Sequence, residues 1–164
     1  MVPENSGHPN SVAAWRKWLS TNHRREAGVC LIMWDKDSGH EWLDYGRLLE
    51  EALCFAWIDS KPAKLDEHRS MPWFAPRKAA TGWSRLNKQR VETAMKVGKM
   101  SPMGLTKTKA AKKDGSWHAL DHVEMLELPD DLAAALTRVP AGCCQLRSIS
   151  AFAQAQHCGM DRKR

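Results

Sequence analysis

The sequence predicts a single small α+β domain in which a short, mainly antiparallel sheet is packed by several helices. Three segments carry apolar residues at helical spacing, whereas the apolar run from Val29 to Trp34 is too short for a stable helix and is typical of a buried strand. The chain has 164 residues, of which 43% are hydrophobic and 27% are charged, as in a globular protein with one core. No apolar run approaches the roughly 18 residues that span a bilayer, so we expect no membrane insertion.

The predicted helices begin after residues that cap a helix well. Asn10 or Ser11, Asp44, Ser84 and Ser101 offer side-chain oxygens to the first free N–H groups of the segment that follows. Pro102 suits a first helical position, and Asp130 with Asp131 complements the positive end of a helix dipole. The predicted helical ranges are about 11–22, 44–56, 84–97, 101–114 and 129–140.

The strands are predicted between these helices. After the buried strand at 29–34, turn residues at 35–39 lead to a second short strand at 40–43, which we expect to pair back on it. Residues 57–59 leave the second helix as a loop or strand. Pro72 argues against a central strand, so edge strands and loops are expected between residues 61 and 76.

Positive charge is concentrated in the middle of the chain. Residues 61–113 carry 14 Lys and Arg against 3 Asp and Glu, and acidic segments flank them on both sides within a net charge of +6. This pattern indicates either an anionic partner or pairing of the basic block with its own acidic flanks.

The most informative stretch is MPWFAPRKAATGWSRLNKQRVE, in which aromatic rings alternate with cations. Such rings stack on bases or sugars while the cations hold phosphate oxygens, and the start of a helix adds free N–H groups for an anion. Solvated cations above rings that fill the core are the alternative. The candidate ligand-binding residues are Trp57, Asp59, Trp73, Phe74, Arg77, Lys78, Trp83, Ser84, Asn87 and Arg90.

Three functions fit this pattern. The first is a non-enzymatic binding protein that contacts a protein partner or a small anionic ligand. The second is a nucleic-acid-binding module that uses residues 73–90. The third is an enzyme acting on a small anionic substrate, which requires Asp59 and the cations of Arg77 and Arg90 to converge in one pocket.

Metal, cofactor and catalytic sites are not predicted. The chain has no glycine-rich phosphate loop, no G-x-S-x-G elbow and no H-E-x-x-H pair. His118 with His122, and Cys143-Cys144 with His157-Cys158, are poor candidates for a zinc site. Cys30 and Cys54 lie among apolar residues, so we interpret them as reduced core thiols.

Several segments occur in the order found in a known family. EEALCFAWIDS, LDEHRSMPWFAPRKAATGWSRLNKQRVE and GKMSPMGLTKTKAAKKDGSW together resemble the YdeI/OmpD-associated family of bacteria, also called bacteriocin-protection proteins, over residues 11–140. The resemblance implies an α+β protein without established catalysis, linked to envelope stress, tolerance of bacteriocins or cationic peptides, and outer-membrane porins. Relatives often have glycine where this chain has Ala56 and Ser60.

The ends of the chain are expected to differ from this domain. Residues 1–10 are polar and contain proline, which predicts a flexible N-terminus without a secretory signal and therefore a cytoplasmic protein. The envelope association of the family makes the periplasm the alternative. Residues 141–164 depart from the family pattern, so we expect a divergent, poorly ordered tail and hypothesise a frame change or truncation in the coding sequence.

Overall fold

The computed structural model describes residues 3–60, 63–125 and 130–138. The chain divides into two compact units, Met1–Leu120 and Asp121–Arg164. The elements of the first unit are β1 (Ser6–Gly7), α1 (Val12–Asn22), β2 (Val29–Leu31), β3 (Met33–Trp34), α2 (Tyr45–Cys54), β4 (Trp57–Asp59), β5 (Arg69–Ser70), β6 (Trp73–Pro76), α3 (Arg85–Lys96) and α4 (Pro102–Lys113). In the second unit the described residues form α5 (Asp121–Glu124) and α6 (Asp130–Thr137).

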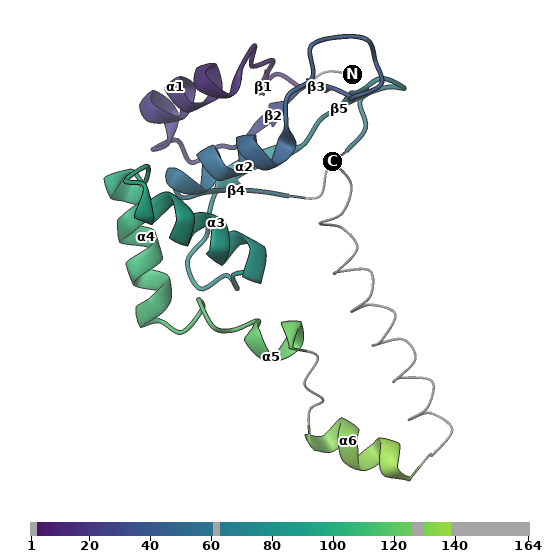
Figure 1. Ribbon diagram of the computed structural model, residues 1–164, viewed down its shortest axis with the longest axis vertical. Coiled ribbons are helices and arrows are strands. Elements are labelled where there is room, and N and C mark those ends of the chain that lie inside the picture. Colours follow the sequence, from purple (N-terminus) through teal and green to yellow (C-terminus); the bar gives the residue numbers. More distant parts are fainter. Residues whose placement is uncertain (1–2, 61–62, 126–129, 139–164) are drawn as a thin grey trace. The chain divides into compact units, whose positions relative to one another are not determined.

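The predicted α+β class is confirmed (Figure 1). The larger sheet has the strand order β1-β2-β6-β4, and β3 pairs with β5 in a second, two-stranded sheet. The sheets are mainly antiparallel, since only β1 with β2 pairs in parallel among the described strands.

Helix α2 is the central element of the first unit, because it contacts α1, α3, α4 and β4. Its apolar stripe explains this position: Leu48, Leu49, Ala52 and Leu53 are all buried. Around this helix, the large side chains that are fully buried include Trp15, Leu19, Leu31, Trp57, Phe74 and Val91.

The helix predictions are confirmed where the structure describes the residues. Ser11, Asp44, Ser84 and Ser101 each accept a hydrogen bond from the N–H three residues ahead and thus cap their helices as expected. Cys30 and Cys54 are buried free thiols, also as expected. At the turn after α2, Ala56 has φ +61°, a left-handed conformation that favours glycine.

The expectation for residues 61–76 is wrong at its end. Trp73–Pro76 is not an edge strand or loop but the internal strand β6, which pairs with both β2 and β4. Pro72 precedes this strand and lacks only the N–H donor. Its carbonyl still accepts from the Leu31 N–H at 2.9 Å, so the proline keeps one bond of this pair and loses only the reciprocal one.

The two other strand predictions need correction as well. Residues 40–43 form no strand, and β3 pairs instead with β5, some 35 residues further along the chain. Residues 29–34 form two short strands rather than one, and β2 and β3 belong to different sheets.

The N-terminal segment is also better defined than expected. Ser6 and Gly7 form β1 and pair in parallel with Cys30 and Leu31. Two flanking bonds, from the Cys30 N–H to the Asn5 carbonyl and from the Ile32 N–H to the Gly7 carbonyl, hold it against β2. The expected tail at residues 141–164 lies outside the described residues.

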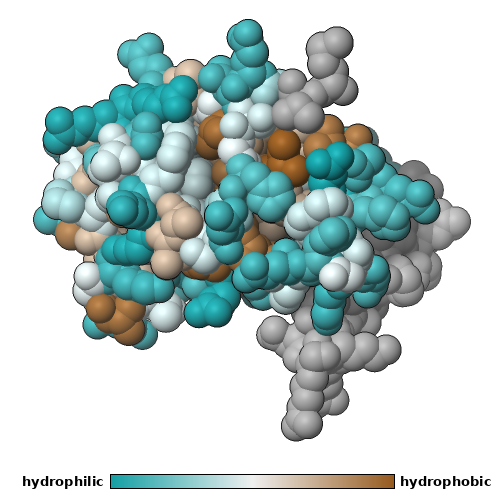
Figure 2. Space-filling view, turned by 90° about the horizontal axis from the view of Figure 1, so that it is seen from above, coloured by the Kyte–Doolittle hydropathy of each residue, from teal (hydrophilic) through white to brown (hydrophobic). Residues whose placement is uncertain are grey.

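The surface of the protein is mostly hydrophilic on the face in Figure 2, with separate hydrophobic patches. Large apolar side chains that are exposed in the first unit are Trp42, Leu86, Met95 and Val97. None of the helices in the described ranges combines the length and the apolar character that a bilayer crossing requires.

Candidate functional site

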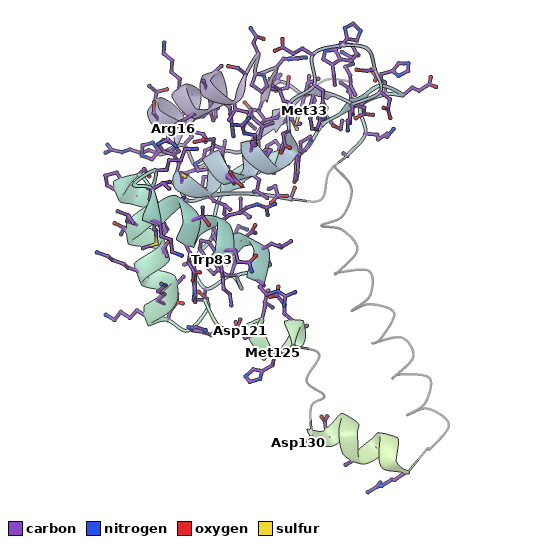
Figure 3. The ribbon with its side chains drawn as sticks, in the orientation of Figure 1. Arg16, Met33, Trp83, Asp121, Met125 and Asp130 are labelled. Carbon is purple, nitrogen blue, oxygen red and sulfur yellow. The ribbon has the colours of Figure 1, made fainter. Side chains whose placement is uncertain are left out.

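Three of the predicted ligand-binding rings are sealed inside the protein. Trp57 and Phe74 are 0% exposed and Trp83 is 2% exposed, which contradicts the expectation that they stack on a ligand. Phe74 meets Trp15 edge to face at 5.5 Å between ring centroids. Trp83 lies just before α3, with its ring 5.0 Å from that of Trp117 (Figure 3). Burying rings of this size stabilises the core through the hydrophobic effect. Rings left exposed as a platform for a ligand would contribute less to stability.

Trp73 is half-buried, so it also offers no free platform. A Cβ added at Gly28 would lie only 2.5 Å from the Trp73 ring, which means that the ring packs directly on the backbone of Gly28. The alternative of rings that fill the core therefore describes this stretch better than an aromatic surface does.

A second set of predicted residues does come together. The Tyr45 hydroxyl donates a short hydrogen bond to Asp59 Oδ2. Arg90 Nη1 donates to Asn87 Oδ1 at 3.3 Å, and the charge of Arg90 acts on Tyr45. Asp59 and Arg90 thus share one neighbourhood at the start of α2.

The chemistry of Tyr45, Asp59 and Arg90 suits them to orient other groups. Burial, together with the hydrogen bond to Asp59, raises the pKa of Tyr45 well above its ordinary value, while Arg90 lowers it only in part. The phenol therefore keeps its proton at neutral pH. A protonated phenol bonded to a carboxylate orients groups and is a poor general base.

Arg77 is the unusual residue of the predicted set, because its guanidinium is buried. The residue is only 8% exposed, and its guanidinium lies 3.8 Å over the Trp83 ring. Nη2 donates to the carbonyls of Thr81 and Gly82, whereas Nε is buried and has no hydrogen-bond partner among the described residues.

Burial lowers the pKa of Arg77 to about 10, and the charge of Asp59 offsets this effect only in part. The side chain is therefore still protonated at neutral pH. A buried cation that is not fully compensated is costly, so its presence indicates a site where a negative group would be favourable.

A small pocket is lined in part by Arg77. The Arg77 pocket, as we call it, has a volume of about 60 Å³. It is lined by Arg77, Lys78, Ala79, Ala80, Thr81, Trp83, Lys107, Ala110, Ala111, Asp114 and Ser116. The loop after β6 forms one wall, and the second half of α4 with the turn after it forms the other.

Positive charge dominates the Arg77 pocket. Three of its lining residues are cationic, whereas the single carboxylate, Asp114, is already occupied by the Ser116 N–H at 2.9 Å. Hydrogen bonds from Ser116 and from the Ala80 N–H lower the pKa of Asp114. Among the described residues, neither Lys78 nor Lys107 forms a salt bridge. The local excess of positive charge favours a small anion.

The remaining predicted residues are Lys78, which lines this pocket, and Ser84, which caps α3. Sequence reasoning missed Lys107, Asp114 and Tyr45. The first two could have been found, since their spacing, with Ala111 between them, puts them on one face of a helix and its final turn. Tyr45 carries no such local signal, because its partner Asp59 comes from another element.

A metal centre finds no support in the described ranges, where no group of three His, Cys, Asp or Glu side chains is arranged to hold an ion. Cys143, Cys144, His157 and Cys158 lie outside those ranges. His118 and His122 have other interactions.

Comparison with known proteins gives one family. No curated protein and no solved structure matches the chain. Residues 8–107 match a family described as a domain of unknown function (DUF8412), and they contain every element from α1 to α3 together with Arg77, Lys78 and Lys107. This match does not test the resemblance to the YdeI/OmpD-associated family, which stays a prediction. Because the matched residues make up more than half of the sequence, the chain belongs to the DUF8412 family.

Proposed function

We propose that this protein is a non-enzymatic binding protein whose Arg77 pocket takes an anionic group of a small ligand or of a protein partner. The observation that carries the proposal is the buried Arg77 guanidinium, whose Nε has no partner among the described residues. An oxyanion in the pocket would supply negative charge to a buried cation that Asp59 compensates only in part.

The size of the pocket limits what it takes. About 10–15 Å³ of such space holds one water molecule, so about 60 Å³ suits a few waters or one small oxyanion. The bound group is therefore a single phosphate, sulfate or carboxylate, either free or at the end of a larger molecule. Lys78 and Lys107 are exposed at its walls and reach the same group from solvent.

The cellular setting of this binding is a proposal from the family resemblance. The YdeI/OmpD-associated pattern suggests a role in envelope stress or in protection against bacteriocins and cationic peptides. An anion-binding protein fits that setting, since an acidic partner protein would present the carboxylates that the Arg77 pocket favours.

The two alternatives have less support. A nucleic-acid module needs exposed rings for stacking, and Trp57, Phe74 and Trp83 are buried. An enzyme would use the Tyr45, Asp59 and Arg90 set, in which the phenol keeps its proton. Binding of single-stranded DNA that weakens steeply with salt, and that Arg90→Ala abolishes, would favour the nucleic-acid alternative instead.

The proposal is tested by calorimetric titration of the full chain with sodium sulfate, with acetate as the carboxylate probe, at low and constant ionic strength. Lys107→Glu should weaken sulfate binding at least tenfold, because it places a carboxylate in the wall of the pocket. Lys109→Glu is the matched control: it changes the net charge equally on the same helix but does not line the pocket, and it should alter the affinity less than twofold. Equal losses in the two variants, or no sulfate binding by the wild-type chain, would overturn the proposal.

A further inference from the structure

A larger cavity, with none of the predicted residues in its lining, lies beside the N-terminal strand. This N-terminal pocket has a volume of about 360 Å³, within the roughly 300–1,000 Å³ range of small-molecule sites. Residues 4–10 form one side, and α1, β2 and Arg25 form the rest. It shares no lining residue with the Arg77 pocket.

The wall opposite the N-terminal segment is apolar and rigid. Trp15, Val29 and Leu31 are buried there, and the Trp18 ring is stacked on the Trp15 ring at 5.1 Å. The Trp15 Nε1–H donates to the Leu48 carbonyl at 3.0 Å, which fixes this ring to α2. An apolar or aromatic body would find a preformed surface on this side.

The other side of the N-terminal pocket is polar and is held in place by backbone pairing. The bonds of Asn5 and Gly7 with β2 fix the segment, so Asn5 and Asn10 line a defined wall. The wall exists only because β1 joins the sheet.

Two opposite charges line the pocket. The Arg25 guanidinium lies 5.7 Å from the centre of the Trp18 ring, and it forms no salt bridge among the described residues. Glu4 is exposed and likewise forms none there. A ligand with one negative charge would pair with Arg25, whereas a second negative charge would be opposed by Glu4.

We propose that the N-terminal pocket binds a small amphipathic monoanion, with its apolar or aromatic body against Trp15 and Trp18 and its carboxylate on Arg25. The planar guanidinium matches a carboxylate through two parallel hydrogen bonds. Ring-bearing carboxylates therefore fit both walls at once. This site is independent of the Arg77 pocket and of the function proposed for it.

The charge preference is tested with three probes that share one ring system: 2-naphthoate, 2-naphthalenemethanol and 2-naphthylmethylammonium. Calorimetric titration of the full chain should give an affinity for the acid at least tenfold higher than for the alcohol, and weaker binding still for the cation. Arg25→Gln should bring the acid to within twofold of the alcohol. Arg24→Gln, a neighbouring exposed cation that does not line the pocket, should leave the preference unchanged.

The location is tested by filling the cavity. Ala14 lines the N-terminal pocket on an exposed face of α1, so Ala14→Phe should abolish binding of both the acid and the alcohol. Ala13→Phe adds the same ring one position away, outside the lining, and should retain binding. Near-ultraviolet circular dichroism checks that both variants fold, and Lys107→Glu should leave naphthoate binding unaltered.

Three results would overturn the proposal: no naphthoate binding by the wild-type chain, equal affinity for the acid and the cation, or equal effects of the Ala13 and Ala14 variants. A failure here leaves sulfate binding at the Arg77 pocket intact, so the two proposals fail separately.

Discussion

Glu51 is a buried carboxylate that joins three parts of the fold. It is only 5% exposed, and its two oxygens accept hydrogen bonds from Arg16 of α1 and from Lys99 of the segment between α3 and α4. Arg16 Nη2 also donates to the Lys99 carbonyl at 2.9 Å, which closes the network. Part of the basic block thus pairs with its acidic flank, as Lys64 does with Asp35.

The network gives the stability of the protein a defined pH dependence. Burial alone would raise the pKa of Glu51, but the hydrogen bonds and charges of Lys99 and Arg16 outweigh it, so the pKa lies below the ordinary value of 4.5. A carboxyl group with a lowered pKa in the folded state stabilises the protein above its unfolded-state pKa. That contribution is lost as the pH falls through the folded-state value.

Glu51→Gln should lower the free energy of unfolding by about 2 kcal/mol at pH 7, because the neutral amide has a single acceptor oxygen and cannot accept from both Arg16 and Lys99. It should also flatten the fall in stability below about pH 4.5. Urea unfolding between pH 3 and pH 7 measures both effects. Glu50→Gln, an exposed neighbour on the same helix, should change neither by more than about 0.5 kcal/mol. Similar pH profiles for the two variants would contradict this account.

At the scale of the elements, capping residues differ in whether they also form hydrogen bonds to a second helix. The Ser11 hydroxyl accepts from the Ala14 N–H at 3.0 Å and does no more than cap α1. Ser101 caps α4 and also bonds to α2, since its hydroxyl donates to the Cys54 carbonyl at 2.8 Å and its N–H reaches the same carbonyl at 3.0 Å. A Cβ at Gly104 would lie 2.2 Å from this carbonyl, so only glycine permits this approach of the two helices.

Ser101→Ala should therefore destabilise the protein more than Ser11→Ala does. Loss of a cap alone costs about 1 kcal/mol. Ser101→Ala additionally removes a hydroxyl donor from the carbonyl of the buried residue Cys54, which raises the expected loss to about 2 kcal/mol. Chemical denaturation of both variants measures the difference, and equal losses would show that the bond to Cys54 contributes nothing.

At the scale of the molecule, the first unit contains the whole described core. Its buried cluster runs from Trp15 to Trp117, and all eight tryptophans of the chain precede Leu120. Among the described residues of the second unit, from Asp121, none belongs to that cluster. The first unit is therefore expected to fold without the second.

A chain of residues 1–120 should unfold cooperatively and keep the near-ultraviolet circular dichroism of the full chain, because the tryptophans that produce this signal keep their packing. The full chain measured under the same conditions is the reference. A broad thermal transition without a near-ultraviolet signal would show that residues after Leu120 are required for the core.

The helices were predictable from the sequence because the signals are local. A helix cap and the helix that it starts lie within one segment, so a capping residue indicates its helix without reference to the rest of the chain. The capping residues here are Ser11, Asp44, Ser84 and Ser101. The sequence indicated the burial of the aromatic residues only as an alternative to rings that stack on a ligand. Even the left-handed Ala56 was signalled only through glycine in the resembling family.

The tertiary structure alone decided which strands pair and where charges meet. β6 lies between β2 and β4, and β3 finds β5, because backbone pairing depends on which segments the core brings together and not on the nearest turn. In the same way, Arg77 lacks a carboxylate partner and Arg25 borders a cavity only because segments distant in the chain fold beside them. Composition and spacing determine the elements and their charge, whereas long-range packing determines which of those charged residues line a pocket.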